Sequence, residues 1–285
     1  KARFDEERNI NWAEEMEHQN VNVVYGFVGL KVHAKLCLVI RREDSGIRTY
    51  VHIGTGNYNP GSAKNYTDLG LLTADPAICS DVTDLFNVMT GYAKRTSYNR
   101  LLVSPTSMRS GLERSIRAEI ERHRREGNGR IVIKCNQLVD AGMIKLLYEA
   151  SIAGVKVDCL VRGICCLKPG IPGVSENITV RAILGKFLEH ARVYWFGPLE
   201  DTEKSFCYIG SADMMGRTPD RRIEVVTPIL DGRLKKRLAE EVLQLQLADN
   251  QRTWLLEKDT YTRIVKKPSE KSVNAQEELI RRYGE

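Results

Sequence analysis

His33-Ala34-Lys35 opens an apolar run, Leu36–Ile40, and His190-Ala191-Arg192 opens a second one, Val193–Phe196, 157 residues further along the chain. Both runs have the length and composition of β-strands. Residues two apart on a strand share a face, so each histidine should point the same way as the cation that follows it. The repeat predicts two copies of one unit, with two imidazoles and two cations facing one cleft.

Each copy ends in a turn of small residues. Gly54-Thr55-Gly56-Asn57 begins 21 residues after His33, and Gly210-Ser211-Ala212-Asp213 begins 20 residues after His190. A glycine-rich loop can turn its backbone N–H groups toward an anion. A plain tight turn would explain the same residues.

Two imidazoles and two cations in one cleft are suited to moving a phosphoryl group. A histidine can attack phosphorus and carry the group as a phosphoramidate, and an ordinary pKa of about 6.5 keeps it available near neutral pH. Lys35 and Arg192 would stabilise the charge on the phosphoryl oxygens. Two ordinary histidines at strand ends are the alternative, which the repeated context disfavours.

Composition bounds the class of protein. The 285 residues are 42% hydrophobic and 28% charged, which is typical of a globular protein of about two domains. No apolar stretch approaches the roughly 20 residues of a membrane span. The net charge of +6 favours an anionic partner, and nucleic acid, acidic lipid and polyphosphate all qualify. Aromatic residues are few and not interleaved with basic ones, which disfavours a surface for single-stranded nucleic acid.

The seven cysteines form no Cys-x-x-Cys pair, which favours a reducing cytoplasm over a disulfide framework or a zinc site. The chain starts at Lys1-Ala2-Arg3 without a methionine and within a helix-like charged segment. We therefore expect an upstream part of the protein to precede it.

Strand and helix patterns alternate along the chain and predict an α/β fold of two units. We place the boundary near Asn99–Arg100, which gives units 1–99 and 100–285, each a mixed β-sheet flanked by helices. Expected strands lie at Val21–Leu30, Leu36–Arg41, Tyr50–Ile53, Arg130–Cys135, Val155–Val161, Asn177–Ile183, Val193–Phe196 and Arg222–Val226; expected helices lie at Asp81–Tyr92, 110–126 with Ser110 as its cap, Leu138–Ala153, Asp231–Leu247 and Ser272–Arg282.

The His-x-Lys layout with its small-residue turn resembles the phospholipase D superfamily, whose fold is a pair of such units. That motif continues with an aspartate five residues after the cation. Here the two positions hold Ile40 and Gly197. The departure counts against a lipase or a nuclease.

A longer resemblance is to the histidine-phosphorylated family of polyphosphate kinases, and it covers nearly the whole chain. It implies that the family's N-terminal and head domains would precede these residues. The strings that carry it are 1–6 (KARFDE), 32–36 (VHAKL), 52–59 (HIGTGNYN), 66–68 (YTD), Gly70-Leu71, 162–165 (RGIC), 187–190 (FLEH), 211–213 (SAD) and 222–225 (RIEV).

The resemblance implies a role for five residues. His33 matches the histidine that is phosphorylated, and His190 matches a second essential histidine placed against the nucleotide phosphates. Tyr66 and Arg162 match residues that hold ATP, and a guanidinium can grip phosphate oxygens in a bidentate way. From the sequence alone, a salt bridge between domains is an equal alternative for Arg162. Arg3 matches an arginine of the metal–phosphate site, where it is not a chemical ligand of the metal.

The implied activity is a reversible transfer of the ATP γ-phosphate to inorganic polyphosphate through phosphohistidine, with ATP or ADP as substrate and Mg²⁺ carried by the nucleotide. The implied partners are polyphosphate, the upstream domains and further copies in a homo-oligomer, with no nucleic acid. A cytoplasmic location, with peripheral membrane association left open, goes with this reading. The alternatives are a phosphodiesterase of the phospholipase D type and a non-catalytic polyanion-binding fragment.

Overall fold

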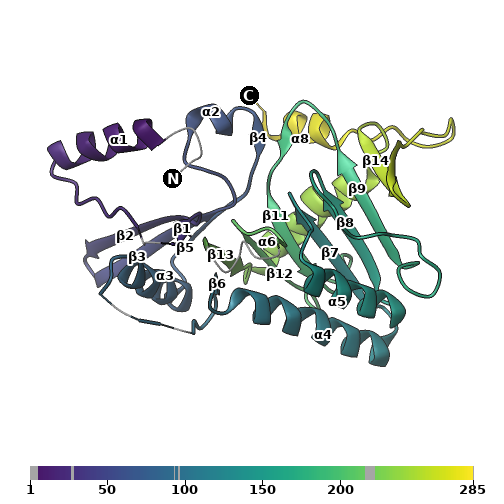
Figure 1. The fold of residues 1–285 in the computed structure, drawn as a ribbon, viewed down its shortest axis with the longest axis horizontal. Helices are drawn as coiled ribbons and strands as arrows, with labels where there is room; N and C mark the ends of the chain where they lie inside the picture. Colours follow the sequence, from purple (N-terminus) through teal and green to yellow (C-terminus); the bar gives the residue numbers. More distant parts are fainter. Residues whose placement is uncertain (1–5, 27–28, 93, 96, 216–221, 285) are drawn as a thin grey trace.

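A computed structural model describes residues 6–26, 29–92, 94–95, 97–215 and 222–284. Figure 1 shows two lobes, which we call the first half (before residue 99) and the second half. The first half holds an antiparallel sheet of order β2-β3-β5, formed by β2 (Lys35–Glu43), β3 (Gly46–Gly54) and β5 (Gly70–Thr73). Alternate residues such as Val51 and Ile53 are buried against α3 (Pro76–Met89). An α/β fold is thus confirmed, although the sheet of the first half is antiparallel.

In the first half, the structure moves one predicted helix start and lacks one predicted strand over its described residues. The helix expected from Asp81 begins at Pro76, because Asp75 accepts hydrogen bonds from the N–H groups of Ala77 and Ile78 and caps it. The strand expected at Val21–Leu30 is wrong over the described residues 21–26, which form no strand. Val21 and Val24 are about half exposed, because no neighbouring strand pairs with this segment.

Three short elements complete the first half. Helix α1 (Glu6–His18) lies apart from the sheet in Figure 1, and β1 (Lys31–Val32) leads into His33. Helix α2 (Pro60–Ala63) begins after Asn59, whose side chain accepts from the Ser62 N–H.

The second half is built on a larger, mixed sheet. Its order is β1-β13-β12-β11-β7-β8-β9-β14-β15, with β6 also paired to β13, so β1 of the first half extends it. The strands β7, β8 and β9 are parallel, whereas β11, β12 and β13 run antiparallel. Its own strands are β6 (Leu102–Ser104), β7 (Arg130–Cys135), β8 (Lys156–Val161), β9 (Ile178–Ile183), β11 (Arg192–Phe196), β12 (Phe206–Gly210), β13 (Arg222–Pro228), β14 (Thr253–Glu257) and β15 (Thr260–Arg263).

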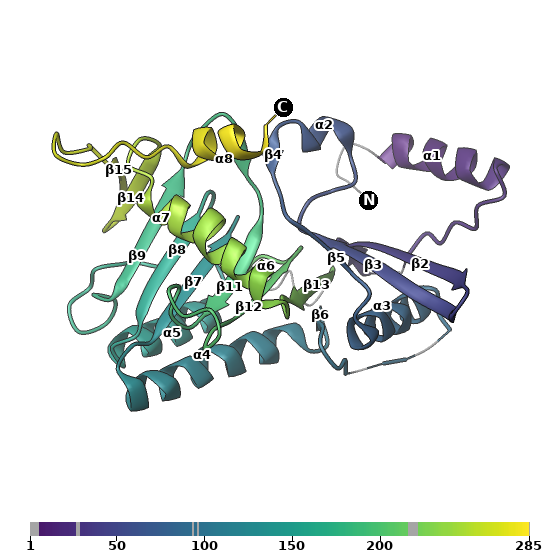
Figure 2. The ribbon, with the colours of Figure 1, turned by 180° about the vertical axis from the view of Figure 1, so that it is seen from behind.

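Helices cover both faces of this sheet. One face packs on α4 (Met108–Glu126) and α5 (Ala141–Ile152). The other face packs on one continuous helical segment, seen across the sheet in Figure 2. That segment consists of α6 (Gly232–Arg237), the π-helical turn η2 (Leu238–Gln244) and α7 (Leu245–Ala248), and α8 (Ala275–Tyr283) follows near the end of the chain.

The sequence misplaced one cap and missed one hairpin in the second half. Helix α4 follows Ser107, and Ser110 lies inside its first turn with its hydroxyl donating to the Ser107 carbonyl. Gly127 ends the helix as expected, with a left-handed φ of 73°. The β14–β15 hairpin carries no strong alternation and was not predicted. Among the described residues, no helix is both long and apolar enough to cross a bilayer.

One buried carboxylate fixes the joint between the halves. Asp81 of α3 is fully buried and accepts from the backbone N–H groups of Asn99, Arg100 and Leu101 and from the Asn99 amide, at 2.6–3.0 Å. The carboxylate thus ties α3 to the connecting chain by four bonds. Such charge-assisted bonds are the strong ones.

We expect Asp81→Asn to lower the free energy of unfolding by about 2–3 kcal/mol, because the amide of Asn cannot accept all four bonds and leaves buried N–H groups unpaired. Urea unfolding measures it. Asp84→Asn on the same helix is the control, since Asp84 makes a partly exposed ion pair with Arg95 worth at most about 1 kcal/mol. Equal losses in the two variants would contradict this account of the joint.

Candidate active site

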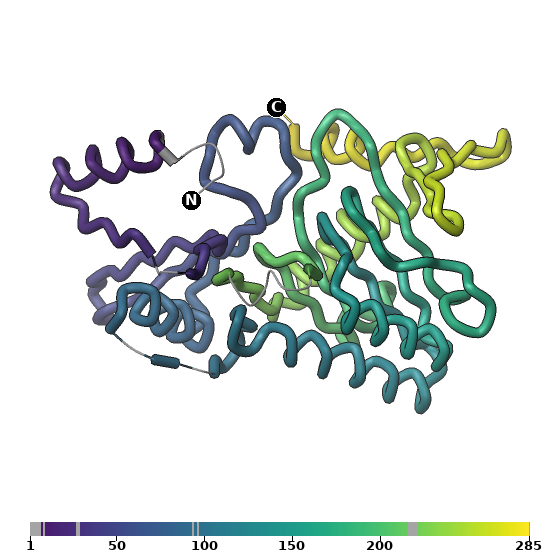
Figure 3. The backbone as a smooth tube through the Cα atoms, viewed as in Figure 1, coloured from purple at the N-terminus to yellow at the C-terminus, as the bar shows by residue number. Residues whose placement is uncertain are grey.

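Two short pairs of parallel strands join the halves. β1 pairs with β13, so that Val32 lies opposite Ile223, and β4 (Tyr66–Thr67) pairs with β10 (Leu188–Glu189). Figure 3 shows the two segments that lead into β4 and β10 running side by side between the lobes. The His33 N–H donates to the Ile223 carbonyl at 2.9 Å, and the His190 N–H donates to the Thr67 carbonyl at 3.2 Å. Each histidine is therefore held by the backbone of the other half.

Each imidazole is also paired with a carboxylate of the other half. His33 Nδ1 lies 2.9 Å from Glu224 Oε2, and His190 Nδ1 lies 2.9 Å from Asp68 Oδ1. Because a carboxylate accepts, Nδ1 carries the proton in both rings and Nε2 keeps its lone pair. The His33–Glu224 pair and the His190–Asp68 pair thus occupy equivalent positions in the two copies of the repeat.

These carboxylates are functional residues that sequence reasoning missed. It sought an aspartate five residues after each cation and found Ile40 and Gly197. The structure supplies the carboxylates from elsewhere. Asp68 lies 14 residues after Gly54, and Glu224 lies 14 residues after Gly210. That equal spacing was a usable signal, but nothing in one sequence shows that the pairs cross between the halves.

His33 has the surroundings that a nucleophilic imidazole requires. Its side chain is 22% exposed. Burial lowers the pKa of His33; the Glu224 carboxylate raises it, and the charges of Lys35 and Arg192 lower it further, so the net pKa lies below the ordinary value. The ring is therefore neutral at pH 7, with the Nε2 lone pair free to attack.

Lys35 is buried next to the backbone of His33 and does not extend into solvent. Its side chain is buried, and its ammonium donates to the His33 carbonyl oxygen. Burial lowers the pKa of Lys35 to about 8, with Glu224 acting to raise it and Arg192 to lower it. The prediction that the two side chains share a face stays a prediction, because Lys35 contacts the backbone of His33. The low pKa adds a group that titrates just above neutrality.

Arg192 occupies the matching position beside His190. It is buried, and its guanidinium donates to the Thr55 carbonyl at 3.2 Å and the His190 carbonyl at 2.9 Å. The same nitrogen lies 3.1 Å from His190 Nε2, and Nε lies 3.3 Å from Asp213 Oδ1. Arg192 thus spans both halves and places positive charge at the His190 ring.

Tyr66 and Arg162 also lie close to His190. The rings of Tyr66 and His190 are 4.9 Å apart at 44°. Arg162 Nε donates to Asn136 Oδ1 at 2.6 Å, and the Asn136 amide reaches the His190 carbonyl at 3.4 Å. The alternative of a salt bridge finds no support, since Arg162 has no carboxylate partner in the described part of the chain. Arg3 lies outside the described residues.

The Gly54–Asn57 loop contacts the Asp68 carboxylate and holds it in place. The Thr55 hydroxyl donates to Asp68 Oδ1 at 2.6 Å, so Oδ1 serves both Thr55 and His190. A Cβ atom at Gly56 would lie 2.1 Å from Asp68 Oδ2. Only glycine allows this approach of loop and carboxylate.

The residues present do not form a resident metal site. Within the ranges that the structure describes, no three His, Cys, Asp or Glu side chains gather into a set that could hold an ion. The two carboxylates of the site are taken up by the imidazoles. A divalent ion at this place would depend on oxygens of a bound ligand.

Comparison with known proteins gives the family. The family model described as "Polyphosphate kinase C-terminal domain 2" matches residues 101–276, and "Polyphosphate kinase C-terminal domain 1" matches residues 1–95. The chain belongs to the polyphosphate kinase family. A polyphosphate kinase of Prosthecochloris aestuarii is 51% identical over 93% of this chain, and one of Parasynechococcus marenigrum is 49% identical over 100% of it.

A solved structure agrees with the sequence relatives. The crystal structure of polyphosphate kinase from Porphyromonas gingivalis matches 96% of this chain with a TM-score of 0.88 and 35% identity. The chain spans 37% and 40% of the length of the two sequence relatives and 42% of that of the crystallised protein. The family resemblance drawn from the sequence is confirmed. The relatives are more than twice as long as this chain.

We expect Gly56→Ala to cost about 1–3 kcal/mol of unfolding free energy, because the new methyl group must push the Asp68 carboxylate away from His190. Thermal or urea unfolding measures the loss. Gly232→Ala serves as control: a Cβ there meets nothing within 4 Å, so the helix start should be unchanged or slightly stabilised. An unperturbed Gly56→Ala protein would mean that the loop does not hold Asp68.

Proposed function

We propose that this chain is the catalytic portion of an ATP–polyphosphate phosphotransferase that works through a phosphohistidine at His33. The observation that carries the proposal is the state of the His33 ring: its Nδ1 is bonded to Glu224, its pKa is lowered, and its Nε2 is left to attack. The membership of the polyphosphate kinase family supports the substrates.

In the first step, Nε2 of His33 attacks the γ-phosphorus of ATP and the bond from that phosphorus to the β–γ bridging oxygen breaks. The electron pair leaves with ADP. The imidazole becomes positively charged as the N–P bond forms, and the Glu224 carboxylate on Nδ1 stabilises that charge. Lys35 and Arg192 add positive charge close to the phosphoryl oxygens.

In the second step, a terminal oxygen of the polyphosphate attacks the phosphorus of phosphohistidine. The N–P bond breaks, the electron pair returns to Nε2, and the polymer is one unit longer. The reverse sequence makes ATP from ADP with the same residues. In this proposal His190 and Arg162 act on the nucleotide phosphates and Tyr66 contacts the nucleotide; the Tyr66 ring lies 4.9 Å from that of His190.

The remaining parts of the proposal come from the family resemblance. Mg²⁺ arrives bound to the ATP phosphates, as it usually does, and Arg3 belongs to that metal–phosphate site. We place the enzyme in the cytoplasm, where ATP is available. The division into units 1–99 and 100–285, the homo-oligomer, the contribution of upstream domains and peripheral membrane association stay predictions.

Labelling with γ-phosphate-labelled ATP and Mg²⁺ tests the proposal. Peptide mapping under alkaline conditions should find the label on the peptide that contains His33, and ADP or polyphosphate should remove it. His33→Ala should lose the label yet still bind polyphosphate. His18→Ala, at an exposed position on α1, is the matched control and should keep the label.

Three results would sink this function. Transfer that survives His33→Ala would show that His33 does not carry the phosphoryl group. Hydrolysis of a phosphodiester without ATP would indicate the phospholipase D type of reaction, in which water accepts the group. Absence of label in the longest natural form of the chain would exclude the phosphohistidine.

The rate of labelling should fall at both low and high pH. As the pH falls through the lowered pKa of His33, the ring takes up a proton on Nε2 and the rate falls. As the pH rises through about 8, Lys35 loses its proton and its charge, and the rate falls again. Single-turnover labelling between about pH 5 and pH 10 measures both limbs.

Lys35→Met separates the two limbs. Without the nearby cation the pKa of His33 should rise, so the acid limb moves to higher pH, while the limb near pH 8 disappears and the maximum rate falls. If the variant keeps its alkaline limb near pH 8, another group titrates there and this assignment of Lys35 is wrong.

A further inference from the structure

A buried carboxylate that the mechanism does not use lies directly before His190. The side chain of Glu189 is 4% exposed and accepts hydrogen bonds from four side chains. Its Oε2 receives Lys134 at 2.7 Å, Gln246 at 2.8 Å and Thr67 at 3.0 Å, and its Oε1 receives Gln276 at 2.7 Å. The donors come from β7, α7, β4 and α8, so the carboxylate joins four elements, and we call this set the Glu189 network.

The network holds a full charge in the interior. Burial raises the pKa of Glu189, but the Lys134 ammonium and the hydrogen bonds from Lys134, Gln276 and Thr67 outweigh burial, and the net pKa is lowered. Lys134 is itself only 4% exposed. Buried ion pairs of this kind seldom add stability over apolar packing, so their contribution is to fix geometry.

The geometry that it fixes is the β4–β10 bridge. Glu189 directly precedes His190, and Thr67 directly precedes Asp68. The hydrogen bond from Thr67 to Glu189 therefore crosses the bridge one residue before the His190–Asp68 pair. Neighbouring residues of a strand point to opposite faces. The network therefore lies behind the bridge, and the imidazole–carboxylate pair lies in front of it.

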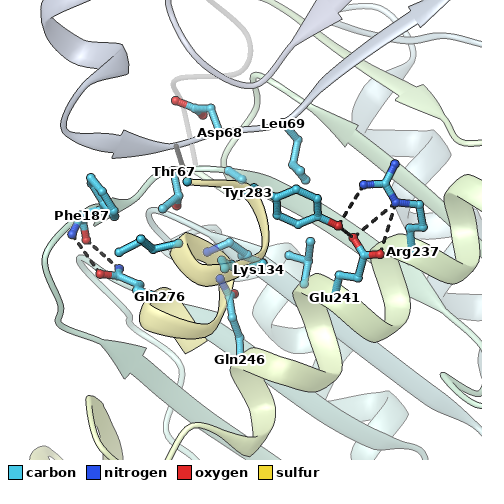
Figure 4. A pocket seen from close by; sticks show the side chains of 15 residues that line it. Thr67, Asp68, Leu69, Lys134, Phe187, Arg237, Glu241, Gln246, Gln276 and Tyr283 are labelled. Carbon is cyan, nitrogen blue, oxygen red and sulfur yellow. Dashed lines mark hydrogen bonds and ion pairs between the residues drawn. The ribbon is translucent and has the colours of Figure 1, made fainter. Parts of the chain in front are cut away.

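Helix α8 enters the network through one side chain. Gln276 accepts from the Phe187 N–H at 2.9 Å and donates to the Phe187 carbonyl at 2.9 Å as well as to Glu189. Figure 4 shows the Gln276–Phe187 pair at one end of a cavity of about 410 Å³, which Lys134 and Gln246 also line. A Cβ at Gly185 would lie 2.3 Å from Gln276 Oε1, so the chain before β10 is shaped around this amide.

The far end of the same cavity offers an internal control. There Tyr283 of α8 donates to Glu241, which is also paired with Arg237 at 3.3 Å. This contact holds α8 against η2 without touching β4 or β10. Loosening α8 at Glu241 and loosening it at Gln276 are therefore separate perturbations.

We propose that Glu189, with Lys134 and Gln276, is a positioning network that sets the register of the β4–β10 bridge and so holds His190 against Asp68 for the transfer. The part that concerns transfer rests on the function proposed above. The part that concerns the His190 ring does not. None of the three residues touches the reacting atoms, and their effect passes through the bridge.

The test compares three variants in the longest natural form of the chain. Gln276→Glu places a second carboxylate against Glu189 and removes the donor. Gln276→Glu combined with Glu189→Gln exchanges donor and acceptor, keeps one negative charge near Lys134 and restores the bond between positions 189 and 276, while the bond to the Phe187 carbonyl stays lost. Glu241→Gln loosens α8 away from the bridge. Each is measured for kcat and KM with ATP, for thermal stability, and for the NMR signal of the His190 Nδ1–H.

We expect Gln276→Glu to lower kcat about 10-fold or more while KM for ATP changes by less than about 2-fold. A small displacement of His190 should weaken its contact in the transition state more than it weakens the binding of ATP. The His190 Nδ1–H signal should shift or be lost. The exchanged pair should regain most of kcat and the signal. Glu241→Gln should keep both within about 2-fold of the unmodified protein, even where its thermal stability falls.

Two results would overturn the proposal. The first is an unchanged His190 signal in Gln276→Glu. The second is a loss of kcat in Glu241→Gln that matches Gln276→Glu at equal thermal stability, since α8 would then act as a merely structural element. Should the unmodified protein carry no label on His33, the proposed function fails, while the imidazole signals of the same samples still decide the positioning role.

Discussion

Everything at the centre of this molecule depends on backbone contacts that cross between its halves. The N–H groups of His33 and His190 are satisfied by carbonyls of Ile223 and Thr67, one residue before Glu224 and Asp68. A strand pair of only two residues would be marginal in isolation. Here it persists because the surrounding sheets and helices fix both partners, and the same contacts deliver each carboxylate to the imidazole of the other half.

Charge is handled differently on the two sides of the site. Lys35 is buried beside His33 and donates to its backbone carbonyl, whereas Arg192 is buried beside His190 and pairs with Asp213 at 3.3 Å. Glu189 is buried behind the bridge and accepts hydrogen bonds from four side chains. Two cations thus lie on the side of the imidazoles, and a hydrogen-bonded carboxylate fixes the scaffold behind them.

The sequence carried the repeat, most of the regular elements and the residues around the two histidines, because periodic burial and paired motifs are local signals. Asp75 before Pro76 shows the limit for boundaries, since a cap that precedes the apolar pattern was overlooked. Glu224, Asp68 and Glu189 show the limit for the site. Their imidazole and ammonium partners lie 55 to 191 residues away, and only the strand pairing of the fold brings them together.

The crossed carboxylates bear on how such a chain could arise. Two identical chains about a two-fold axis would each complete the imidazole of the other, as the halves do here. Once both copies share one polypeptide, the two centres are free to diverge, and they differ as Lys35 does from Arg192 and Asp68 from Glu224. The descendant of a symmetric dimer could thus assign attack to one histidine and substrate contact to the other, a division of labour that identical subunits cannot encode.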